Sequence, residues 1–240
     1  MILLRSFLFD ACFYGLMAVM GILCAPLALA SRDGAYWAVK RYTRIALWLL
    51  RVICGLRTEV RGTPPSGEAL VVAKHQSFLD ILMLVNCLER PKFVMKAELK
   101  WAPVLGWYAM RIGCAPVQRN RKGAAMRQMV QDVTGTADDP GQVVIYPQGT
   151  RVAPGVTAPY KIGAGVLYQR MALDCTPMAT NAGVFWGRNS LWRRPGTAVI
   201  EFLPTVPQGL PIGDFMKRVT VEIEEASQAL EAEAGFRPQD

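Results

Sequence analysis

Short apolar runs bounded by turn residues recur along the C-terminal three quarters of the chain. They predict buried strands at residues 69–73, 92–96, 113–119, 143–147, 176–179 and 198–203. Helical patterns separate these runs or follow them, at residues 81–85, 101–110, 124–133 and 215–234. Alternation of strands and helices predicts an α/β fold with a mixed, mostly buried central sheet flanked by helices.

The N-terminal pattern is different, because residues 11–30 contain no charged side chain. A helix of that length is about 30 Å long, enough to cross the apolar core of a bilayer. A membrane-embedded helix is the preferred interpretation. A cleaved signal peptide ending at Ala30 and a buried core helix are the alternatives, although a single Arg precedes the run and 20 uncharged residues are long for a core helix.

Residues 35–56 mix basic side chains with tryptophan, tyrosine and aliphatic residues. This pattern is typical of a helix at the surface of an anionic membrane, and an ordinary amphipathic core helix is the alternative. The first 61 residues hold eight Lys and Arg against three acids, whereas residues 210–240 hold three against seven. We therefore predict an N-terminal membrane-associated helical pair, and a turn-rich break at 62–67 divides an anchoring unit (1–61) from a catalytic domain (62–240).

Composition narrows the choice of partners. The chain is 52% hydrophobic and carries a net charge of +8, which indicates an anionic partner such as a membrane surface, a phosphorylated substrate, an acidic protein or a nucleic acid. Six scattered cysteines without a CxxC pair predict buried thiols in a reducing compartment. Because the chain has one histidine and no clustered thiols, we expect no metal site.

That histidine, His75, follows the predicted strand 69–73 and precedes the helical run 81–85. Turns at the carboxyl ends of strands are where α/β proteins place their sites. Histidine titrates near neutral pH, and Asp80 is close enough in sequence to orient its ring. A simple His–Asp pair beside a helix cap is the alternative, since Ser77-x-x-Asp80 is also a capping-box pattern.

Residues 75–80, His-Gln-Ser-Phe-Leu-Asp, resemble the HX4D block of the glycerolipid acyltransferases. Further segments are similar to that family in the same order: Lys96-x-Glu98-Leu99 with Pro103 and Gly106, Gly113 to Arg119, Pro147-Gln148-Gly149-Thr150-Arg151, Tyr160-Lys161-Ile162-Gly163 and, weakly, Thr176 to Ala179. The resemblance covers roughly residues 60–205.

The resemblance implies transfer of a fatty acyl group from an acyl thioester, acyl-CoA or acyl-ACP, to the free hydroxyl of 1-acylglycerol-3-phosphate (lysophosphatidic acid). The product is phosphatidic acid, in phospholipid biosynthesis, made at a membrane with the active site on its cytoplasmic face. No cofactor beyond the thioester co-substrate is implied.

The implied catalytic residues are His75 as general base and Asp80 as its orienting carboxylate. The implied substrate-binding residues are Arg119, Gln148, Gly149, Thr150, Arg151 and Lys161. A thioester is reactive enough for direct attack by the hydroxyl. Ser77 as an acyl-enzyme nucleophile is the rival, and no Gly-x-Ser-x-Gly elbow supports it.

Gln148 departs from the resembled family, which has Glu at this position. An amide keeps the shape and an acceptor oxygen but loses the charge. Either the position is structural, with Gln serving nearly as well as Glu, or the lost charge marks a different acceptor or a weakened enzyme. We favour the structural account.

Two other functions remain open at this stage. In the first, the protein is an acyltransferase for another lysolipid acceptor, such as lyso-ornithine lipid. In the second, it is a non-catalytic membrane lipid-binding protein. Interleaved Arg and Trp at residues 37–51 would also suit RNA, but the chain carries no recognition motif for nucleic acid, so we expect no nucleic-acid partner.

Overall fold

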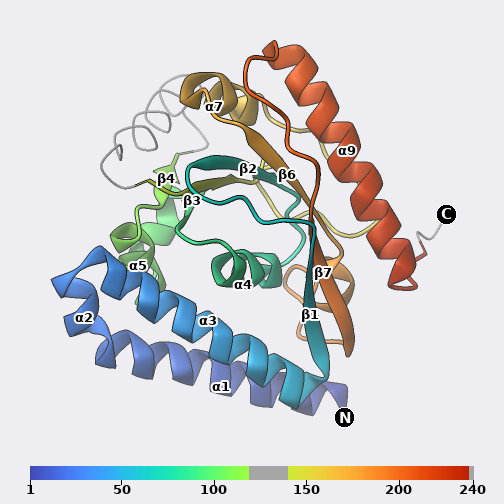
Figure 1. Ribbon diagram of the computed structural model, residues 1–240. Coiled ribbons are helices and arrows are strands. Elements are labelled where there is room, and N and C mark those ends of the chain that lie inside the picture. Colours follow the sequence, from blue (N-terminus) through green and yellow to red (C-terminus); the bar gives the residue numbers. More distant parts are fainter. Residues whose placement is uncertain (119–139, 238–240) are drawn as a thin grey trace.

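The computed structural model describes residues 1–118 and 140–237 (Figure 1). Within these residues one sheet of seven strands runs in the order β1-β7-β6-β2-β5-β3-β4. Neighbouring strands are parallel except β6 and β7, which are antiparallel. The strands are β1 (Leu56–Arg61), β2 (Ala69–Ala73), β3 (Pro91–Lys96), β4 (Ala115–Val117), β5 (Gln142–Ile145), β6 (Cys175–Thr180) and β7 (Gly196–Phe202). The predicted mixed α/β fold is therefore confirmed.

Helices cover both faces of the sheet (Figure 1). One side, here called the front, carries α1 (Ile2–Leu23), α2 (Ala25–Ala30), α3 (Arg32–Cys54), α4 (Phe78–Cys87), the 3₁₀ helix η1 (Ala97–Trp101) and α5 (Leu105–Arg111). The other side, the back, carries α7 (Gly163–Met171) and α9 (Ile212–Glu233), and the short α8 (Ala182–Phe185) packs beside β7.

Strand β2 lies in the middle of the sheet and is buried along its whole length. Val71 and Ala73 pack into the front core, whereas Leu70 and Val72 pack into the back core. This alternation is the period of two that a strand imposes on its side chains. It means that successive residues beyond the end of β2 also point to opposite sides.

The N-terminal region differs in detail from the predicted single helix at residues 11–30. Helix α1 begins at Ile2 and ends at Leu23, and α2 starts after a break at Cys24, with Pro26 in its first turn. Proline suits a first turn because it lacks the N–H that an interior position needs. Helix α1 is long and apolar enough to cross a membrane. Only 17% of its 18-residue apolar stretch is buried.

Helices α1 and α3 pack against each other, as predicted for a helical pair (Figure 1). Helix α3 ends at Cys54, because Gly55 adopts a left-handed conformation (φ 68°), and residues 56–61 continue as β1, paired with β7. Strand β1 thus precedes the predicted boundary at residue 62 but belongs to the sheet, and the division into two units stays a prediction.

An ion pair joins α1 to the body of the protein. Asp10 accepts a hydrogen bond from the guanidinium of Arg193 at 2.6 Å, and the backbone N–H of Arg193 donates to Ser6 at 2.9 Å. The same guanidinium lies 4.5 Å from the ring centre of Trp186. These contacts and the buried rings of Phe9 and Phe13 dock α1 onto the front side. The exposed surface of α1 is predominantly apolar.

Candidate active site

The loop between β2 and α4 fixes the orientation of Asp80. Ser77 is the N-cap of α4, and its hydroxyl accepts from the N–H of Leu79 at 3.0 Å. Asp80 completes a capping box, because one of its oxygens, Oδ2, accepts from the N–H groups of Gln76 and Ser77, both at 2.9 Å. The capping interpretation is therefore confirmed, and the cap leaves the other carboxylate oxygen available.

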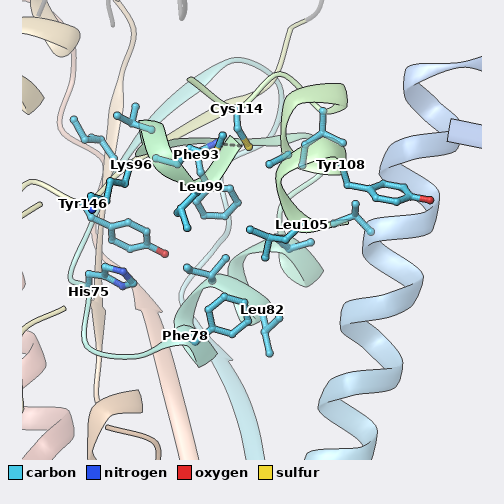
Figure 2. A pocket seen from close by; sticks show the side chains of 18 of the residues that line it. His75, Phe78, Leu82, Phe93, Lys96, Leu99, Leu105, Tyr108, Cys114 and Tyr146 are labelled. Carbon is cyan, nitrogen blue, oxygen red and sulfur yellow. Dashed lines mark hydrogen bonds between the residues drawn. The ribbon is translucent and has the colours of Figure 1, made fainter. Parts of the chain in front are cut away.

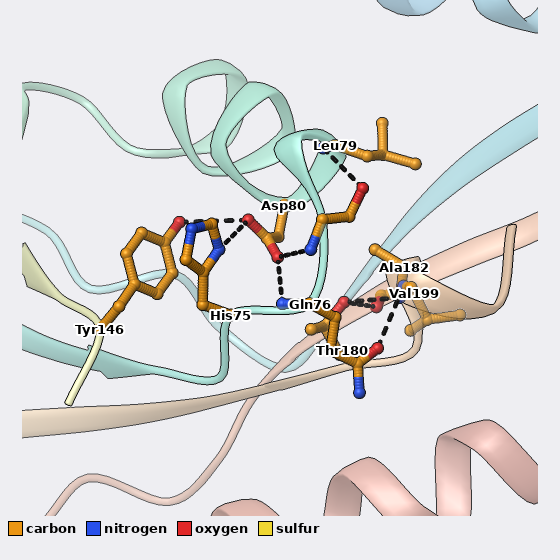
Figure 3. Close-up of polar contacts among 10 residues, drawn as sticks. His75, Gln76, Leu79, Asp80, Tyr146, Thr180, Ala182 and Val199 are labelled. Carbon is orange, nitrogen blue, oxygen red and sulfur yellow. Dashed lines mark hydrogen bonds and ion pairs between the residues drawn. The ribbon is translucent and has the colours of Figure 1, made fainter. Parts of the chain in front are cut away.

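That second oxygen faces the histidine. Asp80 Oδ1 lies 3.0 Å from Nδ1 of His75 (Figure 3). Asp80 is fully buried and accepts hydrogen bonds from its neighbours, so we assign the hydrogen of this contact to Nδ1, which donates to the carboxylate. The lone pair of the neutral ring is then on Nε2. The sequence-predicted pair is brought together in the geometry that a base and its orienting carboxylate need.

Tyr146 completes this group, and sequence reasoning did not single it out. Its ring stacks on that of His75, with centroids 3.9 Å apart and an interplanar angle of 17°, and its hydroxyl donates to Asp80 Oδ1 at 3.4 Å. Burial raises the pKa of Tyr146 well above its usual value, and the Asp80 charge adds to the shift, so the phenol stays neutral. Tyr146 directly follows β5, which pairs with β2, so it lies at the same end of the sheet as His75.

A largely apolar cavity of about 860 Å³ opens beside His75 (Figure 2). Side chains from α1, α3, α4, α5 and β3 form its apolar walls, including Met17, Val39, Leu82, Phe93 and Leu105. Its volume lies within the range of small-molecule sites, roughly 300–1,000 Å³. The cavity can therefore hold an extended apolar group with one end at His75.

Basic side chains line part of this cavity, and the turn that carries Arg151 is bonded to the backbone of His75, because the N–H of Val152 donates to the carbonyl of His75 at 2.8 Å. Lys96, Arg151 and Lys161 contribute to its lining, and so does Gly149. Gly149 has φ 70°, and a Cβ there would lie 2.8 Å from Nζ of Lys161. A side chain at this position would thus be strained and would displace the lysine, which explains the glycine.

The remaining predicted site residues lie elsewhere. Gln148 does not line the cavity; it is 4% exposed and points towards α9. Thr150 is exposed and accepts a hydrogen bond from Arg188 at 3.1 Å. Arg119 lies outside the described residues, as does the predicted helix at 124–133.

The apolar segment around residues 101–110 has two different faces. Val104, Leu105 and Tyr108 line the cavity. Trp101 and Met110 are exposed, at 77% and 44%. One face of this segment therefore borders the cavity, and the other presents apolar surface to the surroundings.

On the back of the sheet, residues flanking His75 contact α9. Lys74 is 2% exposed and its ammonium donates to both oxygens of Glu224, at 2.7 and 2.6 Å. Gln76 is fully buried and donates to Glu231 at 2.5 Å. Burial raises the pKa of Glu231, and the Gly155 N–H and the Gln76 amide oppose that shift. Sequence reasoning missed this network, because about 150 residues separate its partners.

Among the described residues, no group of three or more His, Cys, Asp or Glu side chains is arranged to hold a metal ion. The candidate chemistry of the described site rests on His75, Asp80 and the basic side chains that line the cavity.

Comparison with known proteins gives a consistent result. The chain is 29% identical to a 1-acyl-sn-glycerol-3-phosphate acyltransferase from Pseudomonas aeruginosa over 184 residues, 76% of this chain and 71% of the relative. It is 28% identical to the human 1-acyl-sn-glycerol-3-phosphate acyltransferase alpha, over 87% of this chain and 76% of the relative. A lyso-ornithine lipid O-acyltransferase from Rhodobacter capsulatus is 32% identical over 51% of this chain and 43% of the relative.

The fold also has a solved counterpart. The crystal structure of the 1-acyl-sn-glycerophosphate acyltransferase from Thermotoga maritima superposes with a TM-score of 0.77, covering 97% of this chain and all of that one, at 18% identity. The family model described as Acyltransferase matches residues 57–181, just over half of the chain, and includes His75, Asp80 and the 147–151 turn. The protein therefore belongs to the acyltransferase family.

Proposed function

We propose that this acyltransferase moves a fatty acyl group from an acyl thioester to the free hydroxyl of 1-acylglycerol-3-phosphate, forming phosphatidic acid. The observation that carries the proposal is the His75–Asp80 pair beside an apolar cavity whose lining also includes Arg151 and Lys161. A base, a site for an acyl chain and a site for a phosphate are the three elements that this reaction requires. The two relatives named for this activity, matched over more than two thirds of their length, add support.

In the proposed reaction Nε2 of His75 takes the proton of the acceptor hydroxyl as its oxygen attacks the thioester carbonyl. A C–O bond forms, the C–S bond breaks, and the imidazolium returns the proton to the departing thiolate. Asp80 holds the ring in the required tautomer and stabilises the imidazolium. Ser77 is not needed as a nucleophile, because its hydroxyl is fully buried and occupied in capping α4.

The phosphate of the acceptor is assigned to Arg151 and Lys161. A guanidinium can contact two phosphate oxygens at once, and the nearby ammonium adds a second positive charge. Gly149 leaves room for the phosphate beside the backbone. Arg119, outside the described residues, is retained as a further candidate ligand, and Gln148 and Thr150 are expected to act through their neighbours rather than on the phosphate.

The apolar cavity is assigned to a fatty acyl chain, with its carbonyl at His75. The cavity reaches α1 and α3, the helices that we assign to the membrane. Side chains such as Phe7, Leu8 and Trp48 are exposed on these two helices, at 54%, 55% and 60%. We propose that this surface enters the cytoplasmic leaflet, where basic residues of α3 meet anionic headgroups. Lipid substrates then reach the cavity without crossing water.

A lyso-ornithine lipid is the second acceptor considered. The relative from Rhodobacter capsulatus and the neutral side chain of Gln148 favour it. It lacks a phosphate, so Arg151 and Lys161 would not contribute to its binding as they do for a phosphomonoester.

The test is an acceptor panel on the purified full-length protein in detergent, with acyl-CoA and acyl-ACP as alternative donors. We expect phosphatidic acid from lysophosphatidic acid, and we expect Arg151→Ala to raise KM for this acceptor about tenfold or more with little change in KM for the donor. An enzyme that ignores lysophosphatidic acid and acylates lyso-ornithine lipid contradicts the acceptor assignment. Equal effects of Arg151→Ala on both substrates contradict the phosphate role.

A further inference from the structure

The residues on either side of His75 are held by carboxylates from the C-terminal helix. Lys74 and Gln76 point to the back of the sheet, where Glu224 and Glu231 of α9 meet them. His75 between them points to the front and lines the cavity. Helix α9 lies outside the segment matched by the family model, residues 57–181, yet it contacts both neighbours of the histidine.

Glu224 also reaches the 147–151 turn. Its Oε1 accepts from the side-chain amide of Gln148 at 3.3 Å and from the hydroxyl of Tyr160 at 2.9 Å, beside the bonds from Lys74. One carboxylate therefore joins the end of β2, the turn that carries Gly149 and Arg151, and the segment that precedes Lys161. These are the segments that carry the candidate base and the candidate phosphate ligands.

The charges in this buried network explain why a neutral side chain suits position 148. In this network the cation Lys74 is paired with the carboxylate of Glu224. Burial already raises the pKa of the neighbouring Glu231. A glutamate at position 148 would place another carboxylate about 3.3 Å from Glu224, and two such groups cannot both stay ionised at low cost. The amide of Gln148 donates instead, so its NH₂ group is oriented towards Glu224.

We propose that Glu224 and Gln148 are a pair of positioning residues in which α9 supplies the carboxylate and the turn supplies the neutral partner. The pair fixes the turn of Gly149 and Arg151 against the end of β2 and thereby sets the distance between His75 and the phosphate ligands. The pair needs one carboxylate, either on α9 at position 224 or on the turn at position 148. Two carboxylates, or none, are expected to disrupt it. This inference rests on the proposed function for its catalytic readout.

The test is a charge exchange: Glu224→Gln, Gln148→Glu and the double variant, assayed with acyl-CoA and lysophosphatidic acid on the full-length protein. Each single change is expected to lower kcat/KM for the acceptor at least about tenfold, and KM for the thioester is expected to change less than about twofold. The double variant restores kcat/KM to within about threefold of wild type. Glu225→Gln removes the same charge from an exposed position of α9 and is expected to leave the activity unchanged.

Losses that multiply in the double variant contradict the proposal, and so does a Glu224→Gln protein with wild-type kcat/KM. Thermal unfolding of the same four proteins makes a cycle that needs no substrate: both single changes lower Tm and the double change recovers it. A wild type inactive on lysophosphatidic acid overturns the proposed function alone, and the unfolding cycle still tests the pair. Recovery of Tm without recovery of kcat/KM contradicts the positioning role.

Discussion

The two sides of the sheet at the end of β2 differ in packing and in polarity. The front leaves an open cavity of about 860 Å³ lined mainly by apolar side chains, with His75 and Asp80 at one end. The back is filled, and its charged groups are buried in pairs such as Lys74 with Glu224. A single strand serves both, because consecutive residues point to opposite sides. The reacting side chain therefore lies on one side of the sheet, and the buried contacts that hold its two neighbours in the chain lie on the other.

Two helices of equal length show the same contrast. Helices α1 and α9 each span 22 residues. Helix α9 buries its apolar stripe, including Phe215, Val219 and Ile223, and exposes most of its charged residues, with Glu224 and Glu231 among the exceptions. Helix α1 buries only Ser6, Phe9 and Phe13 and exposes many aliphatic and aromatic side chains. The back helix is suited to water and the front helix to lipid.

Among the variants that keep His75, the largest effect on this contrast is expected from Asp80→Asn on the front. The N–H groups of Gln76 and Ser77 select the oxygen of the amide, so its NH₂ group faces Nδ1 of His75. The ring then takes the other tautomer, and Nε2 can no longer accept a proton. We expect kcat to fall by about 10³–10⁴-fold.

The control for this prediction is Ser77→Ala, which removes the cap of α4 but leaves the His75–Asp80 contact. It should cost about 1 kcal/mol of stability with a much smaller effect on kcat. Steady-state kinetics and thermal unfolding of both variants provide the check. A kcat for Asp80→Asn within tenfold of wild type would contradict the tautomer argument.

On the back, Phe215→Ala should act on stability and spare the chemistry. Phe215 is fully buried and stacks on Tyr168 with ring centroids 3.8 Å apart. Its loss should cost about 3–5 kcal/mol of unfolding free energy, with kcat per folded molecule unchanged. Denaturant unfolding and active-site-normalised kinetics test this. A selective fall in kcat at unchanged stability would mean that the two sides are not separable.

The contrast between the helices is tested by a matched pair of charges. Leu8→Asp on α1 and Val221→Asp on α9 replace side chains of similar exposure, 55% and 45%. We expect Leu8→Asp to weaken binding to anionic vesicles roughly tenfold, because a charge in the apolar part of the leaflet is costly, and Val221→Asp to have no effect. Vesicle flotation gives both values. Equal losses would mean that α1 has no special contact with lipid.

The smallest expected effect is that of Tyr146→Phe, which keeps the ring stacked on His75 and removes one long hydrogen bond to Asp80. A decrease in kcat of about two- to fivefold is predicted. Since the pKa of the buried phenol lies well above the assay range, the decrease should be the same from pH 6 to pH 9. A decrease confined to high pH would instead indicate that Tyr146 ionises during turnover.

Much of the front site follows from local sequence. The apolar run 69–73 predicts β2 to the residue, and the capping pattern from Ser77 to Asp80 places the carboxylate beside the ring of His75. Both are local features, because strand burial and helix capping depend on neighbours within a few residues. The glycine at 149 is explained in the same way by its positive φ.

The back of the site could not be predicted in this way. The contact of Lys74 with Glu224 joins residues 150 positions apart, and neither segment carries a pattern that names the other. A structural role was favoured for Gln148, but nothing near it in the sequence indicates that its amide donates to α9. The strand at residues 56–61 was missed because pairing with β7 determines it. The break at Cys24 was missed although Pro26, in the first turn of α2, is a local signal for it.

Turnover by a His75→Ala variant tests directly whether His75 is the base of an acyl transfer. Purified wild type and variant are given acyl-CoA and lysophosphatidic acid, and phosphatidic acid and free thiol are measured together, with circular dichroism to establish folding. We expect the wild type to form phosphatidic acid and free thiol in equal amounts. We expect kcat to fall by at least about 10³-fold in a folded His75→Ala protein. A folded variant that keeps more than a tenth of the wild-type turnover would contradict it.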